Sequence, residues 1–446
     1  MSALAQVLAH DGISVSGSDR DYDSGANRGL FRKLEVAGVK LCKQDGSAID
    51  GKIKKVIISK AVETDNPDIS AAVKLKIPVS YRQEELKKIF KNSRGIAVAG
   101  TCGKTTVVGM IGCVFDSADK KINVINGGVI KNYADNNRVG NVRMDTFPYT
   151  CVETDESEGD LKGYAPDIGV ITNIGADHMP QEEANRVFNE FTREIKDVLV
   201  VNSESLQILK YRPKKVFSFS VNANADITAQ NINLSNTCSS FTIDGQKVRL
   251  NIPGIHNVYN ALAAIGAGMA YGLPLKSIIE GLEIFRGIGR RYDILGEVNG
   301  VTVVDDYAHN PEKIRASIQT AKIGGKNVIA VYQPHGYGPL RMFINELAEM
   351  FARNISNGDY LFIPDVYYAG GTVNKDISSR NLVEKVKLIN GRANIEYIAD
   401  RSVIETKIKS IARRGDTILI MGARDNTLPE WGNKLCISPS ILNSYS

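Results

Sequence analysis

The segment Ala-Val-Ala-Gly-Thr-Cys-Gly-Lys-Thr-Thr at residues 97–106 places a glycine-containing turn between two apolar stretches. Residues 96–99 are typical of a short buried strand, and residues 107–114 are typical of the helix that follows it. Gly100 and Gly103 allow backbone N–H groups to turn towards an anion at the start of that helix. The segment therefore predicts an α/β sheet with a phosphate-binding loop at its edge.

The side chains of this loop indicate which phosphate compound it binds. Lys104 is predicted to reach the β- and γ-phosphates of ATP, and the hydroxyl of Thr105 or Thr106 to ligate Mg²⁺. Thr101 lies in the same loop. Val98 stands where the usual pattern has its first glycine, so an ordinary strand-to-helix turn is the alternative for this motif taken alone.

The bulk properties exclude several classes of protein. A chain of 446 residues suits about three domains. Its net charge of +5 is spread along the sequence without a basic arm, which argues against a nucleic-acid partner. The six cysteines form no C-x-x-C pair, and no signal peptide or membrane-length apolar run is present. We expect a cytoplasmic protein without a membrane partner, present as a monomer or weak homodimer.

Strand-like runs alternate with helical stretches along the chain, which predicts α/β architecture with parallel sheets. The runs are residues 56–59, 96–99, 168–171, 198–201, 301–304, 328–332, 360–363 and 417–421. Boundaries are expected after the basic stretch 87–94 and after Arg290-Arg291. The predicted domains are residues 1–92, 93–291 and 292–446.

The first domain is predicted to be Rossmann-like. Residues 1–9 are typical of a helix, followed by a strand at 13–16 and a turn at Gly17-Ser18-Asp19. A strand and a glycine-rich turn normally precede such a helix. We therefore expect this domain to lack its first strand because the coding sequence begins further upstream.

Carboxylates crowd the end of the strand predicted near residues 149–153. Four acids fall within six residues: Glu153, Asp155, Glu156 and Glu158. Their mutual repulsion favours a Mg²⁺ site at this strand end, with a solvated acidic loop as the alternative. The segment TNIGADH at 172–178 repeats the arrangement and ends in Asp177 and His178, which suggests a second divalent ion.

Two further loops also place polar residues at the start of a predicted helix or at the end of a predicted strand. His256 and Asn257 stand at the start of a helix of small residues, where they could contact a base or cap the helix. Asp306, His309 and Asn310 follow another predicted strand. Four of the five histidines, at positions 178, 256, 309 and 335, lie in such loops. No serine stands in a G-x-S-x-G elbow, so a serine hydrolase is not indicated.

Taken together, these motifs resemble the Mur ligase family. The matching segments are GTCGKTT at 100–106, ETDESEG at 153–159, TNIGADH at 172–178, PGIHNVYNALAA at 253–264, FRGIGRR at 285–291 and DDYAHNP at 305–311. Other segments are similar to the alanine-adding members: VSGSD at 15–19, VIISKAVETDNPDI at 56–69, IPVSYRQEEL at 77–86, YQPHGYG at 332–338, PDVYYAGG at 364–371, ISS at 377–379 and MGARD at 421–425.

The resemblance implies an ADP-forming acid–amino-acid ligase with three domains: a UDP-sugar domain, a central P-loop ATPase-like domain and a Rossmann-like C-terminal domain. ATP would phosphorylate the lactoyl carboxylate of UDP-N-acetylmuramate, and the amine of L-alanine would then displace phosphate to form a precursor of peptidoglycan. The alternatives are a recycling ligase that adds a preformed tripeptide to the same sugar nucleotide, or a non-catalytic nucleotide-binding relative.

The resemblance also implies roles for individual residues. Thr105 and Glu156 would hold one Mg²⁺, with Glu153 or Asp155 as alternatives to Glu156, and His178 would hold a second ion. His256 and Asn257 would contact adenine, Arg291 the phosphates, and Asp306, His309 and Asn310 the nucleotide or the reacting ends. Gly17, Ser18 and Asp19 would contact the uridine diphosphate, and His335, Arg341 and Tyr367 the remaining substrate. The resemblance further implies that Lys104 acts on the ATP phosphates as an electrostatic catalyst.

This chain departs from the family pattern at two places. Alanine-adding members usually read HRYSRT where this chain reads HGYGPL at 335–340, so two arginines are missing, although Arg341 follows. Arginines there would pair carboxylates or phosphates in a bidentate manner, so the departure bears on the choice between amino acid and tripeptide. Cys102 replaces a histidine in the phosphate loop, a change we expect to be tolerated because the backbone binds the phosphates.

Overall fold

The computed structural model describes residues 1–91, 93–156, 161–175, 179–222, 224–325, 327–368 and 374–437. The chain separates into two compact units. The first comprises residues 1–233, 239–251 and 255–288, and the second comprises residues 234–238, 252–254 and the chain from Gly289 onward. Every strand-like run predicted from the sequence forms a strand, and the α/β architecture is confirmed.

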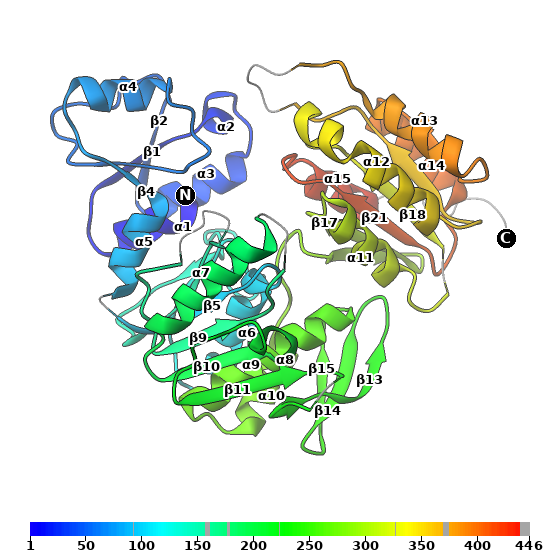
Figure 1. Ribbon diagram of the computed structural model, residues 1–446. Helices are drawn as coiled ribbons and strands as arrows, with labels where there is room; N and C mark the ends of the chain where they lie inside the picture. The colour runs from blue at the N-terminus through cyan, green and yellow to red at the C-terminus, as the bar shows by residue number, and fades with distance from the viewer. Residues whose placement is uncertain are drawn as a thin grey trace. The chain divides into compact units, whose positions relative to one another are not determined.

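An eight-stranded sheet forms the centre of the first unit, with the strand order β12-β11-β10-β9-β5-β8-β6-β7. Figure 1 labels four of its neighbouring strands, β11, β10, β9 and β5. Its strands are β5 (Arg94–Ala99), β6 (Asn123–Ile125), β7 (Val142–Arg143), β8 (Tyr149–Glu153), β9 (Ile168–Ile171), β10 (Val198–Asn202), β11 (Lys215–Ser220) and β12 (Ile227–Thr228). All neighbours are parallel except β6 and β7. The central strand β5 is apolar throughout its buried length, as expected of a parallel strand covered on both faces.

Helices cover both faces of this sheet. On one face, α5 (Arg82–Lys91) and α7 (Gln181–Glu194) bury Phe90 and Phe188 against Ala97 and other strand residues. On the other lie α6 (Lys104–Ser117), α9 (Ile255–Tyr271) and α10 (Leu275–Ile284) (Figure 1). A short α8 (Ser203–Leu206) follows β10.

Helix α6 is buried all round. Every residue from Val107 to Phe115 is buried. Its glycines permit close packing, since a Cβ on Gly112 would lie 2.5 Å from the hydroxyl of Tyr133 and one on Gly109 would lie 2.9 Å from the ring of Phe285. The helix that follows the phosphate loop is therefore fixed by packing rather than by its polar surface.

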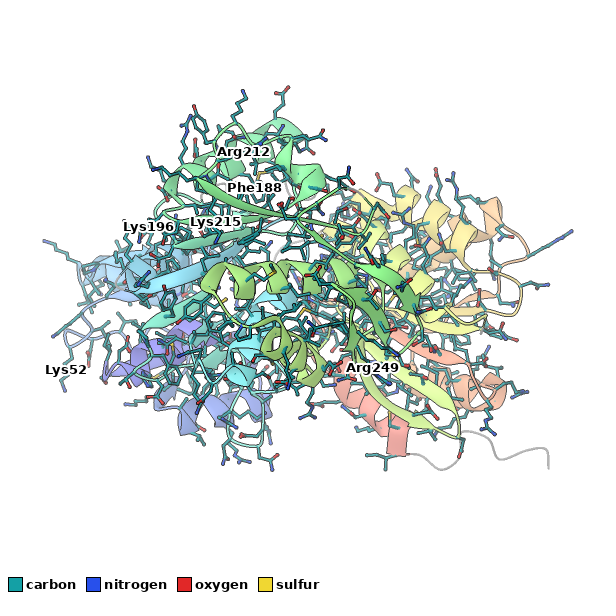
Figure 2. All side chains as sticks on the ribbon, turned by 90° about the horizontal axis from the view of Figure 1, so that it is seen from below. Lys52, Phe188, Lys196, Arg212, Lys215 and Arg249 are labelled. Carbon is teal, nitrogen blue, oxygen red and sulfur yellow. The ribbon has the colours of Figure 1, made fainter. Side chains whose placement is uncertain are left out.

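The two ends of the sheet differ in their side chains. Figure 2 shows Lys196 and Lys215 close to each other; Lys196 precedes β10 and Lys215 begins β11. These are the amino-terminal ends of the strands. The predicted nucleotide-binding loop follows the opposite, carboxyl-terminal end of β5, where open α/β sheets bind their ligands.

The N-terminal part of this unit contains two small parallel sheets, β1-β2 and β3-β4. Its elements are α1 (Ser2–His10), β1 (Val15–Ser18), α2 (Arg20–Asp23), α3 (Arg28–Val36), β2 (Val39–Cys42), β3 (Val56–Ile58), α4 (Pro67–Lys74) and β4 (Val79–Tyr81). The expected turn at residues 17–19 is wrong in part, because Gly17 and Ser18 pair with β2 inside the strand. The predicted strand was placed two residues too early.

A third small sheet, with three strands, was not predicted. Strands β13 (Gln230–Leu234), β14 (Ser239–Ile243) and β15 (Gln246–Leu250) form it, and β14 and β15 are antiparallel. Asp244 and Gly245, both with positive φ, make the hairpin turn. The Asp-Gly pair between alternating apolar residues was the signal that sequence reasoning missed.

A six-stranded sheet with the order β16-β17-β21-β18-β19-β20 forms the centre of the second unit. Its strands are β16 (Asp293–Val298), β17 (Val301–Asp306), β18 (Val328–Tyr332), β19 (Tyr360–Ile363), β20 (Ile395–Tyr397) and β21 (Thr417–Met421). Only the edge strand β16 runs antiparallel within this described sheet.

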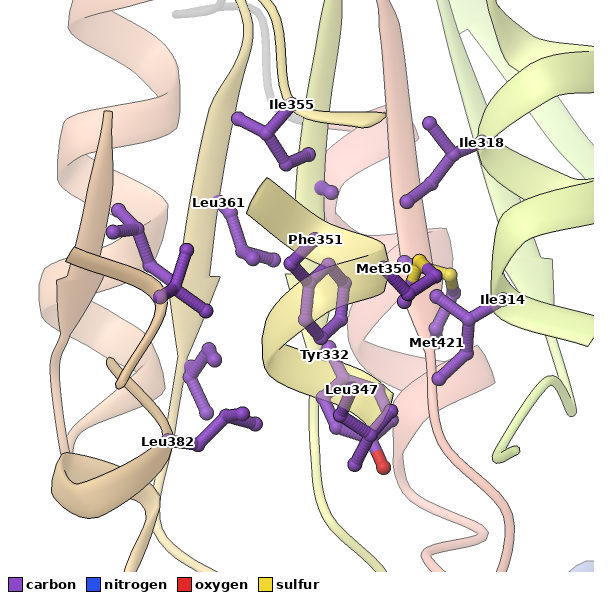
Figure 3. Close-up of a cluster of buried hydrophobic side chains, with 14 of the residues drawn as sticks. Ile314, Ile318, Tyr332, Leu347, Met350, Phe351, Ile355, Leu361, Leu382 and Met421 are labelled. Atoms are coloured by element: carbon purple, nitrogen blue, oxygen red, sulfur yellow. The ribbon is translucent and has the colours of Figure 1, made fainter. Parts of the chain in front are cut away.

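Two layers of helices bury this sheet. One layer contains α11 (Pro311–Ala321), α12 (Tyr337–Asn354) and α13 (Ser379–Ile389), and the other α14 (Arg401–Ile411) and α15 (Leu428–Ile437). Figure 3 shows Leu347 and Phe351 of α12 directed at Tyr332 and Leu361 of the sheet. In the described part of the chain, no helix is both long enough and apolar enough to cross a membrane.

Candidate active site

The phosphate loop joins the central strand β5 to the buried helix α6. Gly100 has φ of +139° and Gly103 has φ of +88°, values that favour glycine. A Cβ on Gly100 would lie 1.9 Å from Oγ1 of Thr172, and one on Gly103 would lie 2.2 Å from Oδ1 of Asn260. Both glycines are therefore required by backbone conformation and by space.

The segment after β9 holds this loop in place. The backbone N–H of Cys102 donates to Oδ1 of Asn173 at 3.0 Å, and the hydroxyl of Thr172 donates to the carbonyl of Cys102 at 2.6 Å. The N–H of Thr101 donates to the carbonyl of Asn173 at 3.1 Å. The TNIG part of the predicted TNIGADH motif thus supports the loop, whereas Asp177 and His178 lie outside the described residues.

Lys104 is the first residue of α6 and bends back over the loop. Its ammonium donates to the carbonyl oxygen of Gly100 at 2.6 Å and to Oε1 of Glu156 at 2.8 Å. The side chains are 13% and 4% exposed for Lys104 and Glu156. Burial raises the pKa of Glu156 above its usual value, and the neighbouring Lys104 acts in the opposite direction.

Thr105 contacts Glu153, the last residue of β8. Its hydroxyl donates to Oε1 of Glu153 at 2.7 Å, and the N–H of Gly127 donates to the other carboxylate oxygen at 2.6 Å. The sequence paired Thr105 with Glu156 and kept Glu153 as an alternative; in the structure Thr105 bonds to Glu153, while Glu156 bonds to Lys104.

A hydroxyl and a carboxylate in contact are the oxygen ligands that Mg²⁺ uses together with substrate phosphates, so this pair fits the ion. The described residues contain no group of three or more His, Cys, Asp or Glu that would form a complete protein cage for a metal. A Mg²⁺ ion that shares its coordination with a nucleotide needs no such cage.

The start of α9 completes this part of the site. Asn257 is buried and accepts a hydrogen bond from Nδ2 of Asn260 at 3.0 Å, and Asn260 in turn lies against Gly103. His256 is exposed on the first turn of the same helix. The two asparagines of the predicted His-Asn-Asn group therefore lie beside the phosphate loop.

Ser18 of the predicted UDP-binding turn is linked to Asp68, which sequence reasoning did not single out. The hydroxyl of Ser18 donates to Oδ2 of Asp68 at 2.5 Å, and the N–H of Gly46 donates to Oδ1 at 2.8 Å. Asp19 caps α2 by accepting from the N–H of Asp21 at 2.9 Å. The DNPDI segment was the available signal for Asp68.

The second unit places its own polar residues at the carboxyl ends of its strands. Asp306 is buried and accepts from the hydroxyl of Ser317 at 2.5 Å and from the N–H of Ala308 at 3.0 Å. Arg291 is exposed, with its guanidinium 5.2 Å from the centre of the Tyr307 ring. Asn310 caps α11 by accepting from the N–H of Lys313 at 2.9 Å.

Arg290 was not predicted as a site residue, yet it anchors this sheet edge. It donates to Oδ2 of Asp305 at 3.2 Å and to the carbonyl oxygens of Gly422 and Ala423 at 2.6 and 2.7 Å. Burial raises the pKa of Asp305 to about 7 although Arg290 opposes the shift. The doubled Arg290-Arg291 was visible in the sequence as a boundary signal only.

The remaining predicted substrate residues lie in the second unit as well. The rings of His309 and His335 meet edge to face, with their centres 5.0 Å apart. Arg341 forms an ion pair with Asp376 and donates to the carbonyl of Asn374 at 3.0 Å. The backbone N–H of Tyr367 donates to the carbonyl oxygen of Pro334 at 2.8 Å, which joins the loops after β19 and β18.

Sequence comparison identifies the family. Residues 1–94, 98–268 and 290–424 match, in this order, the Mur ligase family catalytic domain, the Mur ligase middle domain and the Mur ligase glutamate ligase domain. A UDP-N-acetylmuramate–L-alanine ligase of Geobacter sp. (strain M21) is 34% identical over 439 residues, which cover 95% of this chain and 92% of that protein. The chain belongs to the Mur ligase family. The resemblance inferred from its motifs is confirmed.

Solved structures of Mur ligases share the three-domain fold. A UDP-N-acetylmuramate–alanine ligase from Thermotoga maritima aligns with a TM-score of 0.79 and 24% identity, covering 98% of this chain and 95% of that one. A murein peptide ligase from Psychrobacter arcticus aligns with a TM-score of 0.66 and 21% identity, covering 100% and 97%. The predicted three-domain α/β fold class is confirmed.

Proposed function

We propose that this Mur ligase joins L-alanine to the lactoyl carboxylate of UDP-N-acetylmuramate and converts ATP to ADP and phosphate. The observation that carries the proposal is the partly buried Lys104, held between the Gly100 carbonyl and Glu156 at the mouth of the phosphate loop. Relatives that bear the name of this activity match 95% of the chain, which supports the choice of substrates.

The reaction has two balanced steps. A carboxylate oxygen of the sugar nucleotide attacks the γ-phosphorus of ATP, the bond to the β,γ-bridging oxygen breaks, and ADP leaves with that electron pair. The amine of L-alanine then attacks the carbonyl carbon of the acyl phosphate, the carbon–oxygen bond breaks, and phosphate leaves as the amine loses its proton. The barrier arises mainly from bringing anions together, so catalysis rests on positioning and charge neutralisation.

The residues of the first unit supply these effects. N–H groups of the loop bind the phosphates at the start of α6, and Lys104 neutralises charge on the γ-phosphate. Glu156 keeps the Lys104 ammonium aimed at the loop. Thr105 and Glu153 would hold Mg²⁺, which supplies further charge neutralisation at the phosphates.

Other assignments stand as part of this proposal. Glu156 and His178 are retained as further metal ligands, His256 and Asn257 as adenine contacts, and Arg291, Asp306 and His309 as contacts for phosphate or the reacting groups. Gly17, Ser18 and Asp19 are proposed for the uridine diphosphate, and His335, Arg341 and Tyr367 for the acceptor. We further propose a cytoplasmic location and a monomer or weak homodimer; the six cysteines are free, as expected in a reducing compartment.

The test is an assay of phosphate release. The protein is incubated with ATP, Mg²⁺ and UDP-N-acetylmuramate, together with L-alanine, glycine, L-serine or the tripeptide. Phosphate release that requires L-alanine, with the amide product identified by mass spectrometry, supports the proposal. Turnover only with the tripeptide identifies a recycling ligase. Failure to release phosphate with any of these acceptors identifies a non-catalytic nucleotide-binding relative.

A further inference from the structure

Three loops meet at the carboxyl edge of the sheet in the second unit. Asp306 of β17 and Tyr332 of β18 both stand in register with Met421 of β21. The loops are joined beyond these positions, since Gln333 N–H donates to the carbonyl of Met421 at 2.9 Å and Gly422 N–H to that of Asp306 at 3.1 Å. Residues that follow the three strand ends at the same spacing are thereby brought to one place.

His309, His335 and Arg424 occupy that equivalent position, each three residues beyond its strand end. The two imidazoles are 5.0 Å apart between ring centres. Burial lowers the pKa of the His335 imidazole to about 4, and the charges of His309 and of Arg424 add smaller shifts in the same direction. His335 is therefore neutral at pH 7, and its Nδ1 is buried without a hydrogen-bond partner among the described residues.

The guanidinium of Arg424 differs from those of three other arginines of the second unit. Arg290 is bound by Asp305 and by carbonyl oxygens, Arg341 by Asp376 and Arg401 by Asp425. Arg424 is exposed and makes no hydrogen bond or ion pair with the residues that the structure describes. It is a cation with unused donors, and its charge acts on a neutral imidazole that also has an unused nitrogen.

We propose that Arg424 binds the α-carboxylate of the amino-acid substrate and is a specificity-determining residue of this ligase. A planar guanidinium matches a carboxylate in a bidentate manner. The loop at 335–340 contains no arginine, so it cannot supply this group itself. A single positive charge next to neutral His335 matches the single negative charge of a carboxylate better than the double charge of a phosphate.

This inference rests on the proposed function, and it is tested with Arg424→Ala, Arg424→Lys and, as a control, Arg392→Ala, an exposed arginine that follows α13. Steady-state kinetics are measured for L-alanine, for ATP and for UDP-N-acetylmuramate. We expect Arg424→Ala to raise KM for L-alanine by about tenfold to a hundredfold, with a smaller rise for Arg424→Lys. The KM values for ATP and the sugar nucleotide, and all constants of the control, should change less than about twofold.

L-Alaninamide, which lacks the carboxylate, separates recognition from a general loss of function. Wild type should prefer L-alanine strongly, whereas Arg424→Ala should use the two amines with similar efficiency. An unchanged KM for L-alanine, an equal loss with L-alaninamide, or a rise confined to the KM for ATP would each overturn the inference.

A binding measurement keeps this result separate from the proposed function. Saturation-transfer NMR is recorded with L-alanine and with L-alaninamide on wild type and Arg424→Ala, without turnover. If wild type forms no amide product, the proposed function fails. Weaker binding of L-alanine, but not of L-alaninamide, to the variant would still support the role of Arg424, and equal binding by both proteins would refute it.

Discussion

Lys104 and the buried Glu156 form an ion pair at the mouth of the phosphate loop, with the ammonium 2.8 Å from Oε1 of the carboxylate. The side chains of Lys104 and Glu156 are only 13% and 4% exposed, so this is not a surface ion pair. The pair therefore keeps the Lys104 ammonium at the start of α6, where the proposed function places the terminal phosphates of ATP.

The first prediction concerns that charge. Lys104→Met should lower kcat by about a hundredfold or more, because it removes the cation that neutralises the transferred phosphate. Glu156→Gln should be milder, since the amide can still accept from Lys104. The measurements are steady-state phosphate release and circular dichroism to confirm folding. Near-normal activity in a folded Lys104→Met protein would contradict the assigned site.

The second prediction separates the two acids near the loop. If Thr105 and Glu153 hold Mg²⁺, Glu153→Gln should raise the Mg²⁺ concentration needed for half-maximal activity by about tenfold or more. Glu156→Gln tests the rival metal ligand and should shift this concentration less, because Glu156 bonds to Lys104 whereas Glu153 bonds to Thr105. Titration of activity with Mg²⁺ at saturating ATP provides the comparison, and a larger shift for Glu156→Gln would transfer the role to that residue.

The third prediction tests the space around the loop. Gly103→Ala would place a methyl group 2.2 Å from Asn260 in a backbone conformation with φ of +88°. We expect a loss of ATP affinity, measured by fluorescence titration with a labelled nucleotide. Gly245→Ala is the control, because Gly245 has a φ of +75° in a hairpin with open space around it. Equal effects of the two changes on ATP affinity would show that the space around Gly103 does not control nucleotide binding.

The fourth prediction concerns pH. Burial raises the pKa of Asp305 from 3.8 to about 7, so between these values the folded state retains a proton that the unfolded chain has lost. The contribution of Asp305 to stability therefore falls as pH rises from about 4 to about 7, and is constant above. Asp305→Asn should melt close to wild type at pH 5 and at a higher temperature at pH 8. A difference in Tm that does not vary with pH would contradict this account.

The fifth prediction concerns the core drawn in Figure 3. Leu347→Ala removes a buried side chain of α12 and should lower the free energy of unfolding by about 2–5 kcal/mol. Leu388→Ala makes the same chemical change on α13, where the side chain is 85% exposed, and should cost little. Denaturant unfolding followed by circular dichroism measures both. Similar losses for the two variants would show that α12 does not carry the core as described.

Local patterns predicted the framework well because parallel strands are continuous apolar runs. The runs at 168–171, 328–332 and 417–421 form strands over the same residues. The strand near residue 15 was placed two residues early because Ser16, Gly17 and Ser18 carry little apolar signal. What fixes that strand is its pairing with β2, which depends on residues more than twenty positions away.

The sequence indicated which residues belong to the candidate site better than it indicated which of them bond to each other. The sequence shows that Glu153 and Glu156 are both acidic and close to a strand end, but not which of them reaches Thr105. That choice follows from the pairing of β5 with β8, which brings Glu153 beside the loop, while Glu156 lies farther along the chain and meets Lys104. Asp68 and Arg290 were not predicted as site residues for the same reason, since their hydrogen-bond partners are remote in sequence.

Helix α6 is enclosed on every side from Val107 to Phe115, and its glycines leave no slack against Phe285 and Tyr133. A nucleotide bound at the amino end of α6 would therefore contact a helix that cannot shift, because moving the helix would require its neighbours to repack. Substitutions among the residues that pack around α6 would therefore displace the triphosphate, even though these residues do not contact it.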